Sequence, residues 1–288
     1  MTHTAPRTKR SLSSVTGTGA AASLALGILV LVCTFVAVAV PRASLDYRTQ
    51  ALQRLFRSTS SAQRAVVADA DITGLTGSYL SVAQLDVSQT VLAAGLRHQG
   101  LPLAPPAAQW AGLDSGSSSF SGGRPPKTGA PPAMELMYRN SLARDTVLVA
   151  GSLPASVITR PGTADTFQVA VTTATAAKFG LHTGTRLRMY GLTLVVTGIV
   201  RPRHPASSLW TIDPVAAAPE LIGAGSTTNA PYWSGAAFIG EDELVPMQQD
   251  MNNGPLHALW SFPLSLGSVT ADQAAALRLV PTDVAAGR

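Results

Sequence analysis

The sequence predicts an α+β fold: one N-terminal transmembrane helix followed by a two-lobed mixed α/β extracytoplasmic domain with a β-rich insert. Three observations lead to this prediction. A long uncharged apolar run stands near the N-terminus. Strand-like runs then alternate with a helical apolar pattern, and several short alternating runs separated by turn residues follow. We therefore expect a cytoplasmic tail (1–19), a transmembrane helix (20–40), a stalk helix (41–66), an αβ lobe (67–150), a β-rich lobe (151–240) and a return to the αβ lobe (241–288).

Composition excludes several classes of protein. Charged residues make up 13% of the chain and apolar residues 46%, which is unlike a disordered, highly charged chain. Residues 1–40 carry three cations and no acid, so the rest of the chain has 18 Lys and Arg and 16 Asp and Glu, which nearly balance. No basic run is interleaved with aromatic residues, and we expect no nucleic-acid partner. The single cysteine, Cys33, excludes an intrachain disulfide and a Cys-based zinc site.

Residues 20–40 are expected to cross the membrane as a helix. Their length corresponds to about 31 Å of helix, close to the hydrocarbon thickness of a bilayer, and only a helix satisfies the backbone of a lone span. The alternative is a signal peptide cleaved after Ala39, but the apolar run is longer than a usual h-region. The residues assigned to the span include Leu24, Leu26, Gly27, Leu29, Leu31 and Phe35.

The orientation of this span is not decided by charge, because Arg and Lys flank it on both sides. By analogy with signal anchors, we expect a cytoplasmic N-terminus and residues 42–288 outside the cell membrane. The partner implied by the span itself is membrane lipid.

Beyond the span, apolar spacing and turn residues predict the remaining elements. Residues 45–57 carry a helical apolar stripe, which indicates either a stalk helix or a surface helix packed on its own domain. The Ser/Gly/Pro-rich stretch 114–132 is predicted to be a loop. We expect strands at 64–72, 134–138, 147–150, 236–239 and 259–264, and helices at 82–98, 140–146, just after 240 and at 271–279.

Residues 167–200 carry the most detailed pattern. Thr172 or Thr173 is placed to cap a helix, and Gly180 follows it as the usual left-handed stop. Tyr190-Gly191 is the expected reversal between two strands, and Gly198 suggests a bulge or a close backbone approach. The predicted elements are a strand at 167–171, a helix at 174–179 and strands at 186–189 and 192–200.

No motif specifies an enzyme, a cofactor or a metal site. The nucleophile elbow, S-x-x-K, HExxH and Walker A patterns are absent, and the five histidines are far apart in the sequence. Two clusters have both a functional and a structural interpretation. An anion could bind to Arg201, Arg203 and His204, although a solvated loop is the favoured interpretation. Trp210 and Asp213 suit a ligand groove, although structural roles are favoured for them, as for Trp233 and Trp260.

The string T-x-A-x-x-F-G-L-x-x-G-x-x-L within 167–200, completed by V-x-G-I-V, resembles FtsX-like ABC transporter permeases of actinobacterial type, in their MacB-type periplasmic core domain. Further strings support the resemblance, among them GLPLAPP at 100–106 and WTIDP at 210–214. The matched family-motif positions, with structural roles, include Ala176, Phe179, Gly180, Gly184 and Gly198.

The resemblance implies a non-enzymatic role in which a separate cytoplasmic ABC ATPase and a second permease copy are partners. ATPase-driven motion would pass through stalk helices to the outer domain. Family members carry at least three further membrane helices after this domain, whereas this chain ends at Arg288, so we expect a truncated member. The alternative is a single-pass cell-envelope binding or scaffold protein with no transporter role. An anchored hydrolase is disfavoured because no nucleophile geometry is present.

Overall fold

The fold is described from a computed structural model of the chain. The structure describes residues 50–51, 54, 58–74, 79–155, 166–224, 230–251 and 254–265. The predicted transmembrane helix 20–40 and the predicted final helix 271–279 lie outside these residues. Within the described ranges, we find no helix long and apolar enough to span a bilayer. Residues 50, 51 and 54 are helical, which agrees with the helix predicted over 45–57.

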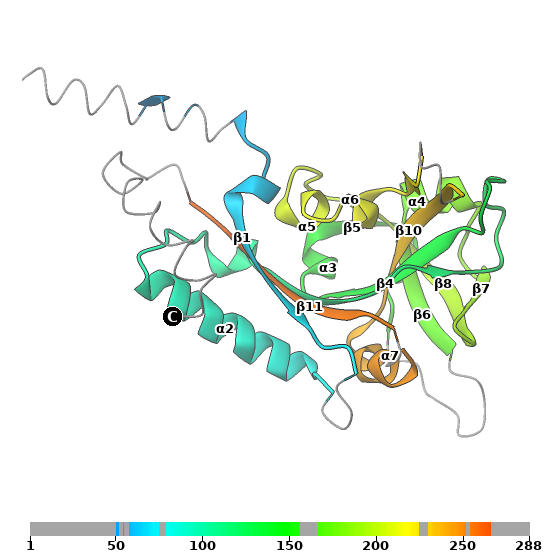
Figure 1. The fold of residues 1–288 in the computed structure, drawn as a ribbon, viewed down its shortest axis with the longest axis horizontal. Helices are drawn as coiled ribbons and strands as arrows, with labels where there is room; N and C mark the ends of the chain where they lie inside the picture. Colours follow the sequence, from blue (N-terminus) through cyan, green and yellow to red (C-terminus); the bar gives the residue numbers. More distant parts are fainter. Residues whose placement is uncertain are drawn as a thin grey trace, which may run out of the picture. The chain divides into compact units, whose positions relative to one another are not determined.

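The described part of residues 55–288 is a mixed α/β domain built on one sheet of eleven strands (Figure 1). The strand order is β1-β11-β2-β4-β10-β6-β8-β5, with β3 paired to β4, β7 to β8 and β9 to β10. The pairs β4/β10 and β6/β8 are parallel, and the others are antiparallel. The strands are β1 (Ala65–Asp71), β2 (Trp110–Ser115), β3 (Ser118–Ser119), β4 (Ala133–Arg139), β5 (Thr146–Gly151), β6 (Thr166–Thr172), β7 (Arg186–Met189), β8 (Leu192–Pro202), β9 (Glu220–Ile222), β10 (Tyr232–Phe238) and β11 (Leu256–Pro263).

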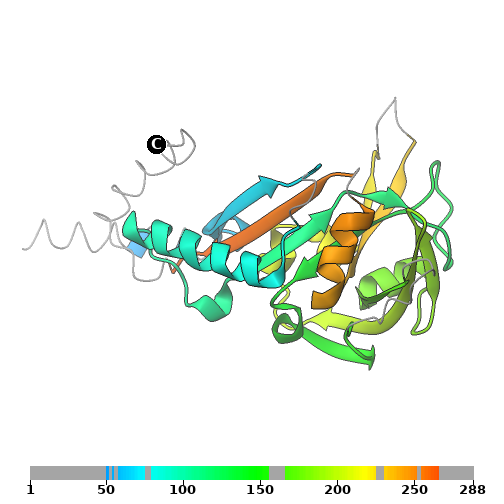
Figure 2. The same cartoon turned by 90° about the horizontal axis from the view of Figure 1, so that it is seen from below.

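Helices cover both faces of the sheet. Both faces are apolar and need cover, because successive strand residues point to opposite sides and buried apolar residues lie on each side. Tyr138 and Met137, neighbours in β4, belong to different buried clusters. The larger cluster packs under α2, α4 and α7, and Figure 2 shows α2 and α7 on the same side of the sheet. The smaller cluster packs under α3, α5 and α6. The helical segments are η1 (Ala62–Arg64), α2 (Val82–His98), η2 (Pro106–Ala108), α3 (Leu142–Asp145), α4 (Thr173–Phe179), α5 (Ser208–Thr211), α6 (Pro214–Ala217), η3 (Glu241–Glu243) and α7 (Leu244–Asp250).

Helix α2 confirms the prediction for 82–98 and has a clear start signal. Ser81 accepts a hydrogen bond from the backbone N–H of Gln84, and the Gln84 side chain accepts one from Ser81 in return. The helix is held against the sheet by Trp260, whose indole N–H donates to the carbonyl of Leu85 at 3.1 Å.

The unit β6–α4–β7–β8 follows the pattern predicted for 167–200 closely. Thr172 caps α4 by accepting from the Thr175 N–H, and Gly180 ends it in the left-handed region at φ 61°. Tyr190 and Gly191 both have positive φ, 53° and 81°, which is the twist that a two-residue hairpin needs. Beside Gly198 the register shifts against β6, with Thr197 as the extra residue, as a bulge would require. The register shift between β5 and β8 lies elsewhere, at Val149 of β5.

Two sequence-based predictions were incomplete. Residues 114–132, expected to be a loop, include the end of β2 and all of β3, and Phe120 within them is buried, with its ring 5.2 Å from that of Phe179. Strand β2 was not predicted, because Gly112 interrupts its apolar pattern and its strand residues are buried on both faces. A fully buried strand does not alternate, so the period that signals a strand is missing.

Candidate functional site

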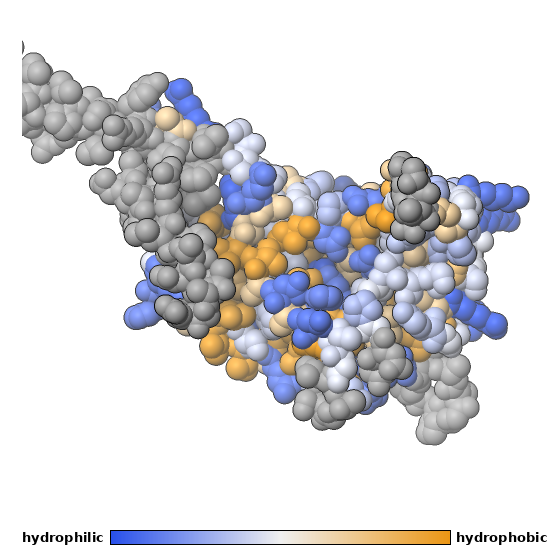
Figure 3. Space-filling view, in the orientation of Figure 1, coloured by the Kyte–Doolittle hydropathy of each residue, from blue (hydrophilic) through white to orange (hydrophobic). Residues whose placement is uncertain are grey.

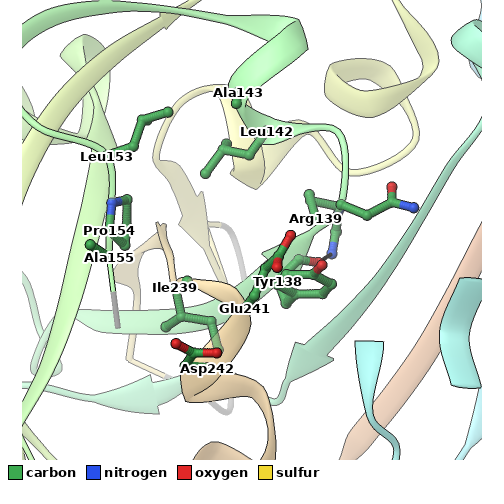
Figure 4. A pocket seen from close by; sticks show the side chains of 12 residues that line it. Tyr138, Arg139, Leu142, Ala143, Leu153, Pro154, Ala155, Ile239, Glu241 and Asp242 are labelled. Carbon is green, nitrogen blue, oxygen red and sulfur yellow. Dashed lines mark hydrogen bonds between the residues drawn. The ribbon is translucent and has the colours of Figure 1, made fainter. Parts of the chain in front are cut away.

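Two parallel strands end side by side at one edge of the sheet, β4 at Arg139 and β10 at Phe238. A cavity of about 300 Å³ lies just beyond these carboxyl ends and is closed on another side by residues 153–155, which follow β5 (Figure 4). In mixed and parallel sheets the carboxyl ends of neighbouring parallel strands are a common place for ligands. We therefore take this cavity as the candidate site.

A buried carboxylate shapes the loop that lines the cavity after β10. Glu243 is 3% exposed and accepts hydrogen bonds from the backbone N–H groups of Gly240 (2.9 Å) and Gln168 (2.5 Å). These bonds fix the turn that presents Glu241 and Asp242 to the cavity. Burial raises the pKa of Glu243 to about 7, against the lowering effect of the two N–H donors.

The cavity also contains a buried hydroxyl. The ring of Tyr138 is 2% exposed, and its hydroxyl has no hydrogen-bond partner among the described residues. Burial raises the pKa of Tyr138 above its ordinary value, and the negative charge of Glu241 adds to the effect. This hydroxyl is therefore a neutral donor near pH 7, facing a cavity that also holds the carboxylates of Glu241 and Asp242 (Figure 4).

A buried ion pair lies behind the cavity, between β4 and β2. The guanidinium of Arg139 is fully buried and binds both carboxylate oxygens of Asp114, with Nη2 donating to Oδ2 at 2.8 Å. The ring of Trp110 stacks on the guanidinium at 4.7 Å. Gly112 makes room for this arrangement, since a Cβ there would lie 2.7 Å from Nη1 of Arg139.

Two further carboxylates surround the ion pair. Asp213 is 4.0 Å from Nη2 of Arg139, and burial raises its pKa. Burial also raises the pKa of Glu135 to about 7, helped by the charges of Asp213 and Asp114 and opposed by Arg139. One cation thus lies among three acids, and Glu135 releases its proton at a higher pH than an isolated carboxylate would.

The described arrangement supports proton uptake by its buried carboxylates. Two described histidines make contacts away from this cavity: Nδ1 of His257 lies 3.0 Å from a carboxylate oxygen of Asp69, and Nδ1 of His182 lies 3.0 Å from the carbonyl oxygen of Thr183. In the described part of the chain, no group of three His, Cys, Asp or Glu is placed to hold a metal ion.

The structure separates the residues that the sequence singled out. Asp213 joins the charge cluster, whereas Trp210 packs in the core with its ring 5.8 Å from that of Phe238. Arg203 donates to the backbone carbonyls of Arg144 and Thr146, both at 3.0 Å, so it supports a loop. Arg201 is exposed on β8, and His204 lines a second cavity. The remaining two tryptophans have structural roles: Trp260 anchors α2, and Trp233 lies under the ammonium of Lys178 at 3.6 Å.

The five family-motif residues occupy positions with structural demands. Ala176 and Phe179 are buried in the larger cluster. Gly180 and Gly184 have φ of 61° and 86°, where a side chain is strained. At Gly198, a Cβ would collide with the carbonyl of Ser152.

The charge cluster itself was missed from the sequence. Its signal is the string MELMYR at 134–139, in which Glu135 and Arg139 share one face of a strand that is otherwise apolar. A charge inside such a strand requires a partner, but the sequence does not say which acid supplies it.

No protein-family model matches the sequence, and a search of curated proteins found no match. The resemblance to FtsX-like permeases therefore depends on the motif residues of this chain alone.

Proposed function

We propose that this chain is the membrane-anchored extracytoplasmic module of an FtsX-like ABC transporter permease, with a MacB-type core. Its apolar segment 20–40 is the anchor, and residues 42–288 form two lobes outside the membrane. The module relays ATPase-driven motion or contacts substrate, and it carries no catalytic centre. Its partners are a cytoplasmic ABC ATPase subunit, a second copy and membrane lipid.

The observation that carries this proposal is the unit β6–α4–β7–β8. Its motif glycines, Gly180, Gly184 and Gly198, occur where the backbone has positive φ or approaches another chain segment closely. These are positions that only glycine fills without strain, so the motif describes a particular backbone path. Matching such a path at several fixed spacings is more specific than matching apolar residues alone.

Affinity purification of the full chain from membranes tests the proposal. We expect an ABC-type ATPase to copurify in stoichiometric amount in mild detergent. A matched control replaces residues 1–40 by a cleavable secretion signal, which releases the same outer domain and abolishes copurification. Recovery of the anchored protein without any ATPase, in cells that express their full set of transporters, would contradict the transporter role.

The alternative is a single-pass cell-envelope binding or scaffold protein, and the cavity beyond β4 and β10 favours it. That cavity presents the carboxylates of Glu241 and Asp242, which suit a cationic group because an ammonium group only donates hydrogen bonds. If this alternative is correct, the anchored protein binds small amines, and Glu241→Gln weakens their binding without any ATPase present.

A further inference from the structure

We propose that a second cavity, at the end of the domain where the chain enters and leaves the sheet, binds a single-chain amphiphile with an anionic headgroup. The headgroup is a carboxylate or a phosphate ester, as in a fatty acid or a lysophospholipid. This inference does not depend on the transporter role, because it concerns a site within the described domain itself.

The cavity has the size and lining of a small-molecule site. Its volume is about 360 Å³, within the range of roughly 300–1,000 Å³ of such sites. Apolar surface dominates its wall, contributed by Ala107 and Ala108 of η2, Leu209 of α5 and Leu264 after β11. Figure 3 shows hydrophobic residues gathered over the region where Figure 1 places the start of β1 beside α5. An acyl chain suits this wall.

The polar part of the cavity has unused donors. The Nε of Arg64 and the hydroxyl of Ser207 are both buried and have no hydrogen-bond partner among the described residues. Both residues line this cavity, as does His204. A buried guanidinium N–H without an acceptor is costly, and an anionic oxygen from a ligand would supply one.

One acid lines the same cavity, but its charge is already balanced. The carboxylate of Asp145 accepts two hydrogen bonds from Arg144, at 3.1 Å from Nε and 2.9 Å from Nη2. The guanidinium of Arg144 therefore already has a carboxylate partner, whereas Nε of Arg64 has no acceptor among the described residues. The cation left for a ligand is Arg64, so the cavity favours an anion over a neutral or cationic headgroup.

The cavity lies where three segments of the chain meet. Ser61 donates to the carbonyl of Ala206 and lies 2.7 Å from the hydroxyl of Thr211, while the N–H of Leu264 donates to the carbonyl of Arg64 at 2.7 Å. The first and last strands of the described sheet are thus joined to the α5 segment around this cavity. A ligand there would bridge all three segments and stabilise their contact.

Calorimetric titration of the full chain in a non-ionic amphipol, free of detergent, tests the site. The probes are octanoate, octyl phosphate, octanol and inorganic phosphate. We expect octanoate or octyl phosphate to bind, and the tighter of the two assigns the headgroup. Octanol and inorganic phosphate should bind about tenfold or more weakly, because octanol lacks the anionic headgroup and inorganic phosphate lacks the apolar chain. Octanol binding as tightly as both amphiphilic anions, or binding by neither anion, overturns the proposal.

Variants link the binding to this cavity. Arg64→Gln should raise the dissociation constant about tenfold or more, whereas Arg186→Gln, at an exposed position on β7, should leave it unchanged. Ala108→Phe should fill the cavity and raise the dissociation constant while the residue at position 64 stays arginine, and Ala83→Phe on the exposed face of α2 is its control. Unchanged affinity in both Arg64→Gln and Ala108→Phe would place the binding elsewhere and refute the site.

Discussion

Replacing Arg139 by Met removes the one cation from a buried cluster of three acids. The Met side chain keeps most of the apolar stem, so the main loss is the charge and its hydrogen bonds. Asp114, whose side chain is 12% exposed, then loses its ion-pair partner, and Asp213 loses a cation at 4.0 Å. Breaking a buried pair by removing one partner costs about 3–5 kcal/mol, and we expect a loss in this range.

The companion variants separate charge from packing. Asp114→Leu with Arg139→Met removes both charges, and we expect it to recover most of the lost stability, because an apolar pair of similar volume is often neutral. Arg188→Met, at an exposed position on β7, is the matched control and should change stability by less than about 0.5 kcal/mol. Urea unfolding of the full chain in mild detergent, followed by tryptophan fluorescence, measures each value. A loss for Arg139→Met no larger than that for Arg188→Met would refute the reasoning.

Three further predictions concern stability. The folded-state pKa of Glu243 is raised from 4.5 to about 7, so this group stabilises the fold below pH 4.5 by up to about 3 kcal/mol relative to pH 7. The melting temperatures at pH 5 and pH 8 should therefore differ less in Glu243→Gln than in the unchanged protein. Gly112→Ala should cost about 3 kcal/mol in urea unfolding, because its Cβ collides with the backbone carbonyl oxygen of Tyr138 and with the Arg139 side chain. Gly95→Ala on α2 meets nothing and should stabilise by up to about 1 kcal/mol. Phe120→Ala should cost about 3–5 kcal/mol, because Phe120 packs edge-on against Phe179.

Each of these has an outcome that contradicts it. An unchanged pH dependence in Glu243→Gln would mean that another group carries the proton. Equal effects of alanine at Gly112 and Gly95 would mean that the β2 backbone moves aside freely. A loss below about 1 kcal/mol for Phe120→Ala would mean that the 114–132 segment is a surface loop after all.

Local elements were predictable because their signals are local. The capping box at Ser81, the left-handed stop at Gly180 and the reversal at Tyr190-Gly191 depend on residues within a few positions of one another. The predictions made at Gly180 and at Tyr190-Gly191 agreed with the structure, whereas the capping box at Ser81 is a local signal that was not among the predictions. The 20–40 segment is likewise a local pattern, and its crossing of the membrane stays a prediction because it lies outside the described residues.

The pairing of distant segments required the tertiary structure. The string MELMYR indicates that Arg139 needs an acid, yet only the sheet brings Asp114 and Asp213 to it from other elements. Similarly, Arg64 and Ser207 meet at one cavity because β1, β11 and the α5 segment come together. The sequence alone determined helix ends, turns and apolar faces, since these depend on backbone preference and spacing. Strand order, the charge cluster and both cavities were decided by packing between residues far apart along the chain, which no local pattern encodes.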